Sequence, residues 1–168
     1  MQAVVVDTNV MVIANGESGR AGPADILVCI DALEKARLKQ IVSIDSGLRF
    51  FDEYFTYMNR SGQPGVGDAF AKWLFENQGN PQRCEQVDIT PKPTDPADFE
   101  EFPNDPDLAG FDRSDRKFVA VAIASAYAPK VLNASDSDWW IFRSQLAKHG
   151  VAVNFLCPNL MPKTRRAR

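Results

Sequence analysis

The sequence predicts an α/β fold built on a parallel sheet. Short runs rich in β-branched residues alternate along the chain with longer segments of helical periodicity, which is typical of β–α–β units. The first run, Ala3–Val6, is continuously apolar, as expected for a central strand that is buried on both faces. The chain has 168 residues, of which 45% are hydrophobic and 24% charged, so its composition fits one globular domain with a sizeable core.

The elements of the first half follow from local signals. Asn15–Gly22 is predicted to be a Gly-rich loop, and Pro23 to be the first residue of a helix that continues over Ala24–Lys39. Gln40–Ile44 is predicted as the second strand, and Ser46 as the cap of the next helix. The remaining predictions up to residue 89 are a helix over Gly47–Met58, a Gly/Pro break over Ser61–Gly67, a helix over Asp68–Asn77 and a strand over Glu85–Ile89.

The segment Thr90–Gly110 interrupts this pattern with five prolines among many acidic residues. We predict a long loop that is mobile or faces a partner, because loops of this length inside a domain are usually functional or disordered. The pattern then resumes with a buried apolar helix over Phe118–Ala126. It is followed by a strand over Val131–Ala134, a helix over Asp138–Lys148 and a final strand over Val151–Leu156.

We predict one domain over residues 1–158 and a basic tail over residues 159–168. The basic run Lys163–Arg168 is expected to be a solvated terminus rather than a nucleic-acid contact. The formal net charge of −3 argues against bulk attraction to nucleic acid but leaves room for a local basic patch.

The cysteines and the hydropathy of the chain indicate a cytoplasmic protein that does not enter a membrane. Cys29, Cys84 and Cys157 form no CxxC pair, which removes zinc ribbons and dithiol redox sites, and free cysteines suit a reducing compartment. The N-terminus has no signal-peptide pattern, and no apolar run approaches the roughly 20 residues that span a bilayer.

Acidic residues stand at the ends of several predicted elements. Asp7 follows the first strand, Asp136 and Asp138 follow the strand Val131–Ala134, and Asp112 and Asp115 begin the buried helix. Ligands of open parallel sheets bind beyond the carboxyl ends of the strands, so these acids can converge there.

Converging carboxylates repel one another unless a cation neutralises them, and hard divalent ions such as Mg²⁺ prefer oxygen ligands. Because the lone His149 reads as a helix C-terminal cap, the acids point to metal-assisted attack on a phosphodiester. Structural interpretations stay open for each acid: Asp7 as part of a turn, Asp112 and Asp136 as caps, Asp115 as a complement to the helix dipole, and Glu53 as a surface residue.

Four motifs of this chain resemble those of the PIN-domain nuclease family, in particular its VapC-toxin-like ribonucleases. The stretch Val4–Val10, with Asp7-Thr8-Asn9, is similar to the family's opening motif, and Glu53 resembles its second acid. Asp115 opens an Ala-rich apolar helix as in the third motif, and Val131–Trp139, which contains Asp136, resembles the fourth. The motif order covers about residues 3 to 156.

The resemblance implies a doubly wound, three-layer α/β/α sandwich with a mostly parallel five-stranded sheet. It also implies hydrolysis of single-stranded or structured RNA with Mg²⁺ or Mn²⁺. Asp7, Asp115 and Asp136 would hold the metal, and Glu53 would ligate it or orient a water. The residues that would support the site or stand in reserve are Thr8, Asn9, Asp112 and Asp138.

The chain departs from the family in small ways. Ala134 stands where the fourth motif usually has Thr, Trp139 replaces Phe, and the segment Thr90–Gly110 is longer than in compact toxin members. The toxin of a toxin–antitoxin pair, a defence nuclease and an RNA-processing nuclease therefore all remain open. An antitoxin-type protein partner and a homodimer are family expectations.

Basic residues near the acids are candidate RNA contacts, with solvated surface residues as the alternative. Trp139 and Trp140 are candidates for base stacking, although at least one of them is expected in the core because adjacent helical residues point in different directions. The candidate phosphate-binding residues are Arg113, Arg116, Lys117 and Arg143.

Three other functions compete with this hypothesis. A catalytically silent PIN-like module would bind RNA or protein without cleaving it, but all four acid positions are filled here. A haloacid-dehalogenase-like phosphatase needs Asp where this chain has Asn9. A flap-endonuclease-type DNA nuclease would be longer and carry more acids.

Overall fold

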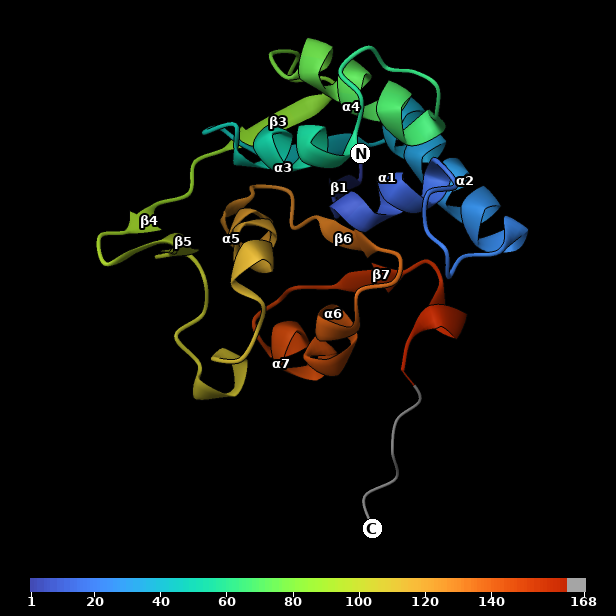
Figure 1. Cartoon of the computed structure of the whole chain (residues 1–168). Coiled ribbons are helices and arrows are strands. Elements are labelled where there is room, and N and C mark those ends of the chain that lie inside the picture. Colours follow the sequence, from blue (N-terminus) through green and yellow to red (C-terminus); the bar gives the residue numbers. More distant parts are fainter. Residues whose placement is uncertain (163–168) are drawn as a thin grey trace.

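The central sheet has five strands, all parallel, in the order β3-β2-β1-β6-β7. The structure is a computed structural model and describes residues 1–162. Helices cover both faces of the sheet, so the predicted three-layer α/β/α sandwich is confirmed (Figure 1). The strands are β1 Ala3–Val6, β2 Ile41–Asp45, β3 Cys84–Val87, β6 Lys130–Asn133 and β7 Val153–Phe155.

The helices divide between the two faces. The helices α1 (Thr8–Ala14), α2 (Pro23–Lys39) and α4 (Val66–Asn77) contact one another on one side of the sheet. On the other side α5 (Arg116–Ala124) packs against β1, β2 and β6, with α6 (Ser137–Ile141) and α7 (Arg143–Lys148) beside it (Figure 1). The helix α3 (Arg49–Tyr57) contacts both α4 and α5, so it links the two layers.

Strand β1 lies at the centre because its side chains are apolar on both faces. All four residues of Ala3–Val6 are buried, as the continuous apolar run predicts. Aromatic packing then ties α3 to α5: the rings of Phe50 and Phe118 lie 4.5 Å apart, and both side chains are fully buried. This contact fixes the starts of α3 and α5 near the carboxyl end of β1.

Two helix starts differ from the prediction for local reasons. The N-cap residue of α3 is Leu48, and the capping acceptor comes from Asp45, not Ser46: the Asp45 carboxylate accepts hydrogen bonds from the backbone N–H groups of Arg49 and Phe50, both at 2.9 Å. The hydroxyl of Ser46 instead donates to Asp88. Helix α4 begins at Val66, where the Asp68 side chain accepts the N–H of Gly65.

Three helices, α1, α6 and α7, differ from the prediction. The prediction of one helix over Asp138–Lys148 is wrong, because Phe142 leaves the helical region at φ −93°, ψ 8° and separates α6 from α7. Helix α1, directly after β1, had no predicted counterpart. Its residues Thr8–Ala14 are mostly β-branched or small, a composition that carries little helical signal by itself.

Within Thr90–Gly110, which was predicted to be one long loop, the structure has regular elements, and the prediction that the segment is mobile or faces a partner stays a prediction. Residues Pro91–Lys92 (β4) and Asp95–Phe99 (β5) form an antiparallel hairpin, and a 3₁₀ turn follows over Pro106–Leu108. A two-stranded ribbon consists of edge strands only, where proline costs no ladder hydrogen bond on its outer side. The segment also supplies three buried apolar side chains, Phe99, Phe102 and Leu108.

The chain leaves the sheet through a further 3₁₀ turn at Pro158–Leu160, and Met161 behind it is buried. The basic run predicted as a solvated tail, Lys163–Arg168, lies outside the described residues. Within residues 1–162, no helix combines the length and the apolar character needed to cross a bilayer.

Candidate metal centre

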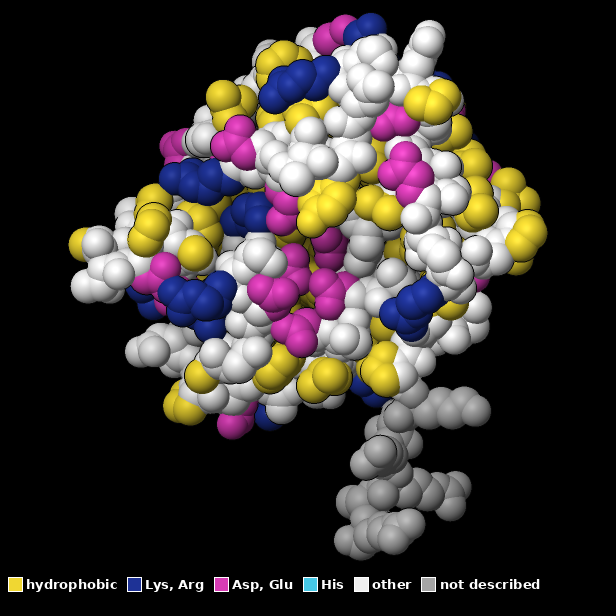
Figure 2. Space-filling model, in the orientation of Figure 1, with side chains coloured by type: hydrophobic (Ala, Val, Ile, Leu, Met, Phe, Trp, Pro, Cys, Tyr) yellow, Lys and Arg dark blue, Asp and Glu magenta, His cyan; other side chains and the backbone are white. Residues whose placement is uncertain are grey.

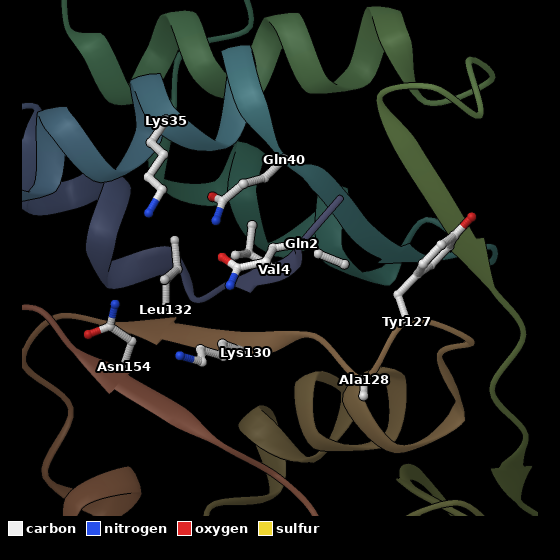
Figure 3. Close-up of a pocket in the computed structure, with 10 residues that line it drawn as sticks. Gln2, Val4, Lys35, Gln40, Tyr127, Ala128, Lys130, Leu132 and Asn154 are labelled. Atoms are coloured by element: carbon white, nitrogen blue, oxygen red, sulfur yellow. The ribbon is translucent and has the colours of Figure 1, made fainter.

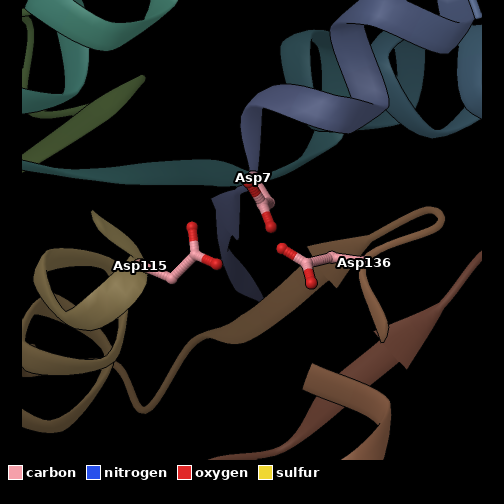
Figure 4. Close-up of side chains that lie close together, drawn as sticks. All are labelled: Asp7, Asp115 and Asp136. Atoms are coloured by element: carbon pink, nitrogen blue, oxygen red, sulfur yellow. The ribbon is translucent and has the colours of Figure 1, made fainter. Parts of the chain in front are cut away.

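Three aspartates meet at the carboxyl edge of the sheet, at the point where the strand order reverses between β1 and β6. Asp7 follows β1, Asp136 follows β6, and Asp115 ends the 3₁₀ turn Arg113–Asp115 that leads into α5. Figure 4 shows the three carboxylates pointing toward one another from these separate elements. One carboxylate oxygen from each lies within 4.8 Å of the others, a spacing that allows all three to share one metal ion.

Asn133, the last residue of β6, holds two of the three aspartates. Its side-chain amide donates to Asp7 Oδ2 at 2.8 Å, and its amide oxygen accepts the backbone N–H of Asp136 at 3.2 Å. Asn133 is fully buried. The sequence analysis did not single it out, although a polar residue closing an otherwise apolar strand was a usable signal.

Burial shifts the ionisation of two of the acids. Desolvation, followed by the charges of Asp136 and Glu53, raises the pKa of Asp7 to about 8. Desolvation, followed by the charges of Asp7 and Asp136, raises the pKa of Asp115 to about 10. Both shifts favour the protonated form, because the carboxylates are buried next to one another with few hydrogen-bond donors around them.

Asp115 shows the deficit most directly. Its Oδ2 atom is buried and accepts no hydrogen bond from the described residues. A buried carboxylate oxygen without a donor is costly, and a cation bound between the three acids would remove that cost. The donor set is oxygen only, which suits Mg²⁺ or Mn²⁺ rather than softer metals.

Glu53 lies at the same edge but is engaged elsewhere. Thr8 donates its hydroxyl to one Glu53 oxygen, and Lys117 donates to the other at 2.8 Å. The group of carboxylates close enough to share an ion therefore consists of Asp7, Asp115 and Asp136. Glu53 lies beside this group, and its ion pair with Lys117 places the Lys117 ammonium next to the three aspartates.

Asn9 supports the edge from the start of α1. Its side-chain oxygen accepts the backbone N–H of Ala134 at 3.0 Å, which ties α1 to the end of β6. Asn9 is thus committed to a backbone contact in the position where a phosphatase of the haloacid-dehalogenase type needs a general acid.

Asp112 and Asp138 form an outer pair with structural contacts. The backbone N–H of Asp112 donates to Asp138 at 2.8 Å, and Asp112 itself accepts from the N–H of Ser114 at 2.9 Å. Burial, followed by the charges of Asp136 and Asp112, raises the pKa of Asp138. Asp112 and Asp136 both act as helix caps, as the structural interpretation of these two acids predicts. Asp112 accepts the backbone N–H of Ser114, and Asp136 accepts that of Asp138 at 2.9 Å.

The four candidate phosphate-binding residues have different surroundings. Lys117 contacts Glu53 next to the acids, and Arg113 is 58% exposed and paired with Asp95. Arg116 is buried instead: its guanidinium contacts Asp98 at 3.1 Å and the carbonyl oxygen of Ala109 at 3.0 Å. The expectation that Arg116 contacts RNA is therefore wrong, since these bonds hold the 90–110 segment to α5.

Arg143 and the two tryptophans lie on α6 and α7. The Arg143 guanidinium lies 3.9 Å from the ring centre of Trp140 and donates to the Trp140 carbonyl oxygen. Trp139 is fully buried and packs edge-on against Phe111, with ring centres 5.1 Å apart. The expectation that at least one tryptophan belongs to the core is confirmed.

A separate cavity of about 180 Å³ lies away from the acids, between the end of α2 and the starts of β1 and β6 (Figure 3). Lys35 of α2, Gln40 at the C-cap of α2 and Lys130 of β6 line it. No carboxylate lines this cavity, so it is not a candidate metal site.

Comparisons of the chain with models of protein families, with curated proteins and with solved structures gave no match.

Proposed function

We propose that the protein is a divalent-metal-dependent endoribonuclease that hydrolyses phosphodiester bonds of single-stranded or structured RNA, using Mg²⁺ or Mn²⁺ held by Asp7, Asp115 and Asp136. The observation that carries the proposal is the convergence of three aspartates at the switch point of a parallel sheet. Two of them have raised pKa values, and one has an unpartnered buried oxygen.

The residues of the site divide the work. Asn133 fixes the orientation of Asp7 through its 2.8 Å hydrogen bond, and the backbone bond from Asp136 to Asn133 places the third carboxylate. A divalent ion held by these carboxylates would lower the pKa of a bound water and would neutralise charge on the phosphate. Lys117, paired with Glu53, provides a cation at the margin of the site for a phosphate oxygen.

The surface around the acids supports a polyanionic substrate. Figure 2 shows the acidic side chains gathered in a hollow of this face, with basic side chains beside them. A chain of net charge −3 has no general attraction for nucleic acid. The attraction for a phosphodiester therefore has to come from cations close to the site, and the basic side chains next to the acids favour such a target. The order of the four PIN-like motifs supports the same reaction.

Finer expectations, one from the cysteines and the N-terminal sequence and two from the resemblance, belong to this proposal as well. They are a cytoplasmic location, an antitoxin-type protein partner and a homodimer.

The test is cleavage of an end-labelled single-stranded RNA by purified protein in Mn²⁺, Mg²⁺ or EDTA. Cleavage should require metal and should be lost in Asp7→Asn and Asp136→Asn. The exposed helix residue Asp31 offers a matched control, and Asp31→Asn should cleave like the wild type. RNA binding without cleavage in any metal would instead favour a catalytically silent binding module.

A further inference from the structure

A pocket opens beside the candidate metal centre, formed where the 90–99 hairpin approaches the starts of α3 and α5. Its volume is about 290 Å³. Lys117 belongs both to this pocket and, through its ion pair with Glu53, to the margin of the acid cluster. The lining residues are Arg49, Asp52, Pro96, Ala97, Phe99, Arg113, Ser114 and Lys117.

The charge of the pocket is opposite to that of the metal centre. Arg49, Arg113 and Lys117 line it, with one carboxylate, that of the exposed Asp52. Each cation has an acidic neighbour outside this lining: Asp45 for Arg49, Asp95 for Arg113 and Glu53 for Lys117. These pairs position the cations and leave further N–H donors for an anion, because a guanidinium carries five donors and an ammonium three.

One part of the pocket wall is apolar. Pro96, Ala97 and Phe99 come from β5, and the Arg49 guanidinium lies 5.4 Å from the centre of the Phe99 ring. Phe99 is buried, so its ring supports the guanidinium. The guanidinium and the exposed Pro96 and Ala97 provide a surface on which a base can stack.

The hairpin that carries this wall is fixed to the rest of the domain. Asp98 contacts Arg116 of α5 and Lys92 of β4, both at 3.1 Å. Burial raises the pKa of Asp98, but the hydrogen bonds from Lys92 and Arg116 outweigh it, so its pKa is lowered and the carboxylate stays ionised. The pocket is therefore a formed feature, and its wall does not depend on a ligand to hold it.

We propose that this pocket binds the nucleotide next to the scissile phosphate: its phosphate lies against Arg113 and Lys117, and its unpaired base lies against Pro96, Ala97 and Arg49. The inference rests on the proposed function and adds a substrate class to it. A volume of about 290 Å³ lies at the low end of ligand pockets, which span roughly 300–1,000 Å³, so it takes one nucleotide rather than a duplex. The preferred substrate is RNA that is single-stranded beside the cleaved bond.

The test separates binding from cleavage. Binding of a fluorescent single-stranded RNA is measured by anisotropy in EDTA, with an abasic RNA of equal length as the second probe. Two variants change the pocket. Ala97→Glu places a carboxylate on its exposed wall, and Arg113→Ala removes a cation. Arg37→Ala is the matched control, because Arg37 is also a surface arginine paired with an acid, Glu34, but lies on α2.

The wild type should bind the base-bearing RNA about tenfold more tightly than the abasic RNA, as expected for one stacked base. Ala97→Glu and Arg113→Ala should weaken binding of the base-bearing RNA about fivefold or more, Arg37→Ala should not, and thermal unfolding should show that all variants are folded. Equal binding of both RNAs by the wild type, or wild-type binding by both folded variants, would overturn the pocket assignment. Pocket-dependent binding without metal-dependent cleavage would overturn the proposed nuclease function and leave the pocket standing. Metal-dependent cleavage that the pocket variants leave unchanged would overturn the pocket assignment and leave the proposed nuclease function standing.

Discussion

Replacing Asp115 by asparagine should stabilise the metal-free protein and remove its response to divalent metal. The Asp115 Oδ2 atom is buried without a hydrogen-bond partner, so the substitution deletes no donor contact at that atom. Asparagine has nearly the same shape and no charge, and its amide can donate to a neighbouring carboxylate. A gain in stability when a carboxylate is removed is expected where the surroundings suit a bound metal better than the metal-free protein.

The size of the effect follows from the ionisation of Asp115. Its pKa is raised to about 10 in the folded protein, against roughly 3.9 in an unfolded chain. The folded state therefore holds a proton that the unfolded state releases, and stability falls as the pH rises above about 4. The loss is of the order of 4 kcal/mol at pH 7 and smaller at pH 5. Two charged carboxylate oxygens at the 4.8 Å limit of this cluster, at an effective dielectric constant of about 20, repel by roughly 3 kcal/mol, which is the same order.

The assay is urea unfolding in EDTA at pH 5, 7 and 8, for the wild type, Asp115→Asn and the surface control Asp31→Asn. The Asp115 variant should gain stability over the wild type as the pH rises, and the control should not. In Mn²⁺ at about 100 times its dissociation constant, the wild type should gain about 2.7 kcal/mol, and Asp115→Asn much less. An Asp115→Asn protein that is less stable than the wild type in EDTA at pH 7, or that keeps the full Mn²⁺ stabilisation, would refute the reasoning.

Three further outcomes are expected. Asn133→Ala should weaken Mn²⁺ binding about 10- to 100-fold in a calorimetric titration, because it frees Asp7 and the Asp136 backbone; unchanged affinity would remove Asn133 from the site. Arg116→Ala should lower the urea midpoint by an amount equivalent to about 1.5–3 kcal/mol, since it removes the charged hydrogen bond to Asp98 while Lys92 still pairs with that carboxylate; a midpoint within error of the wild type would show that the hairpin is held otherwise. The amide of Phe102 should exchange slowly with solvent, because it is hydrogen-bonded to the Phe99 carbonyl beneath buried side chains; exchange at the rate of a free peptide would support a mobile segment instead.

The five strands of the central sheet and three metal-binding candidates could be predicted from the sequence because their signals are local. The apolar run Ala3–Val6 is typical of a strand buried on both faces, and Asp7 directly follows it. Asp115 and Asp136 stand at the start of an apolar helix and after an apolar strand, so the topology rule for parallel sheets brings them to the same edge. Each of these inferences needs only periodicity and position.

The three-dimensional structure decided what depends on distant neighbours. Arg116 and Lys117 are adjacent basic residues in the sequence, yet Arg116 is buried against Asp98 while Lys117 reaches Glu53. Nothing local in the sequence links Asn133 to Asp7, which lies 126 positions away and accepts a hydrogen bond from Asn133 in the folded protein.

The segment Thr90–Gly110 shows the same limit most clearly. Its prolines and acids predict a loop, because composition records local backbone preference and net polarity. Its hairpin is stabilised by contacts to other elements: Asp95 with Arg113, Asp98 with Arg116, and Phe99 buried beneath Arg49. Residue types and their spacing thus determined the layers of this protein and its acidic edge. Only the tertiary structure determines which charges are paired and where the hairpin forms a pocket wall beside the candidate metal centre. The reason is that pairing energies depend on distances that the sequence does not contain.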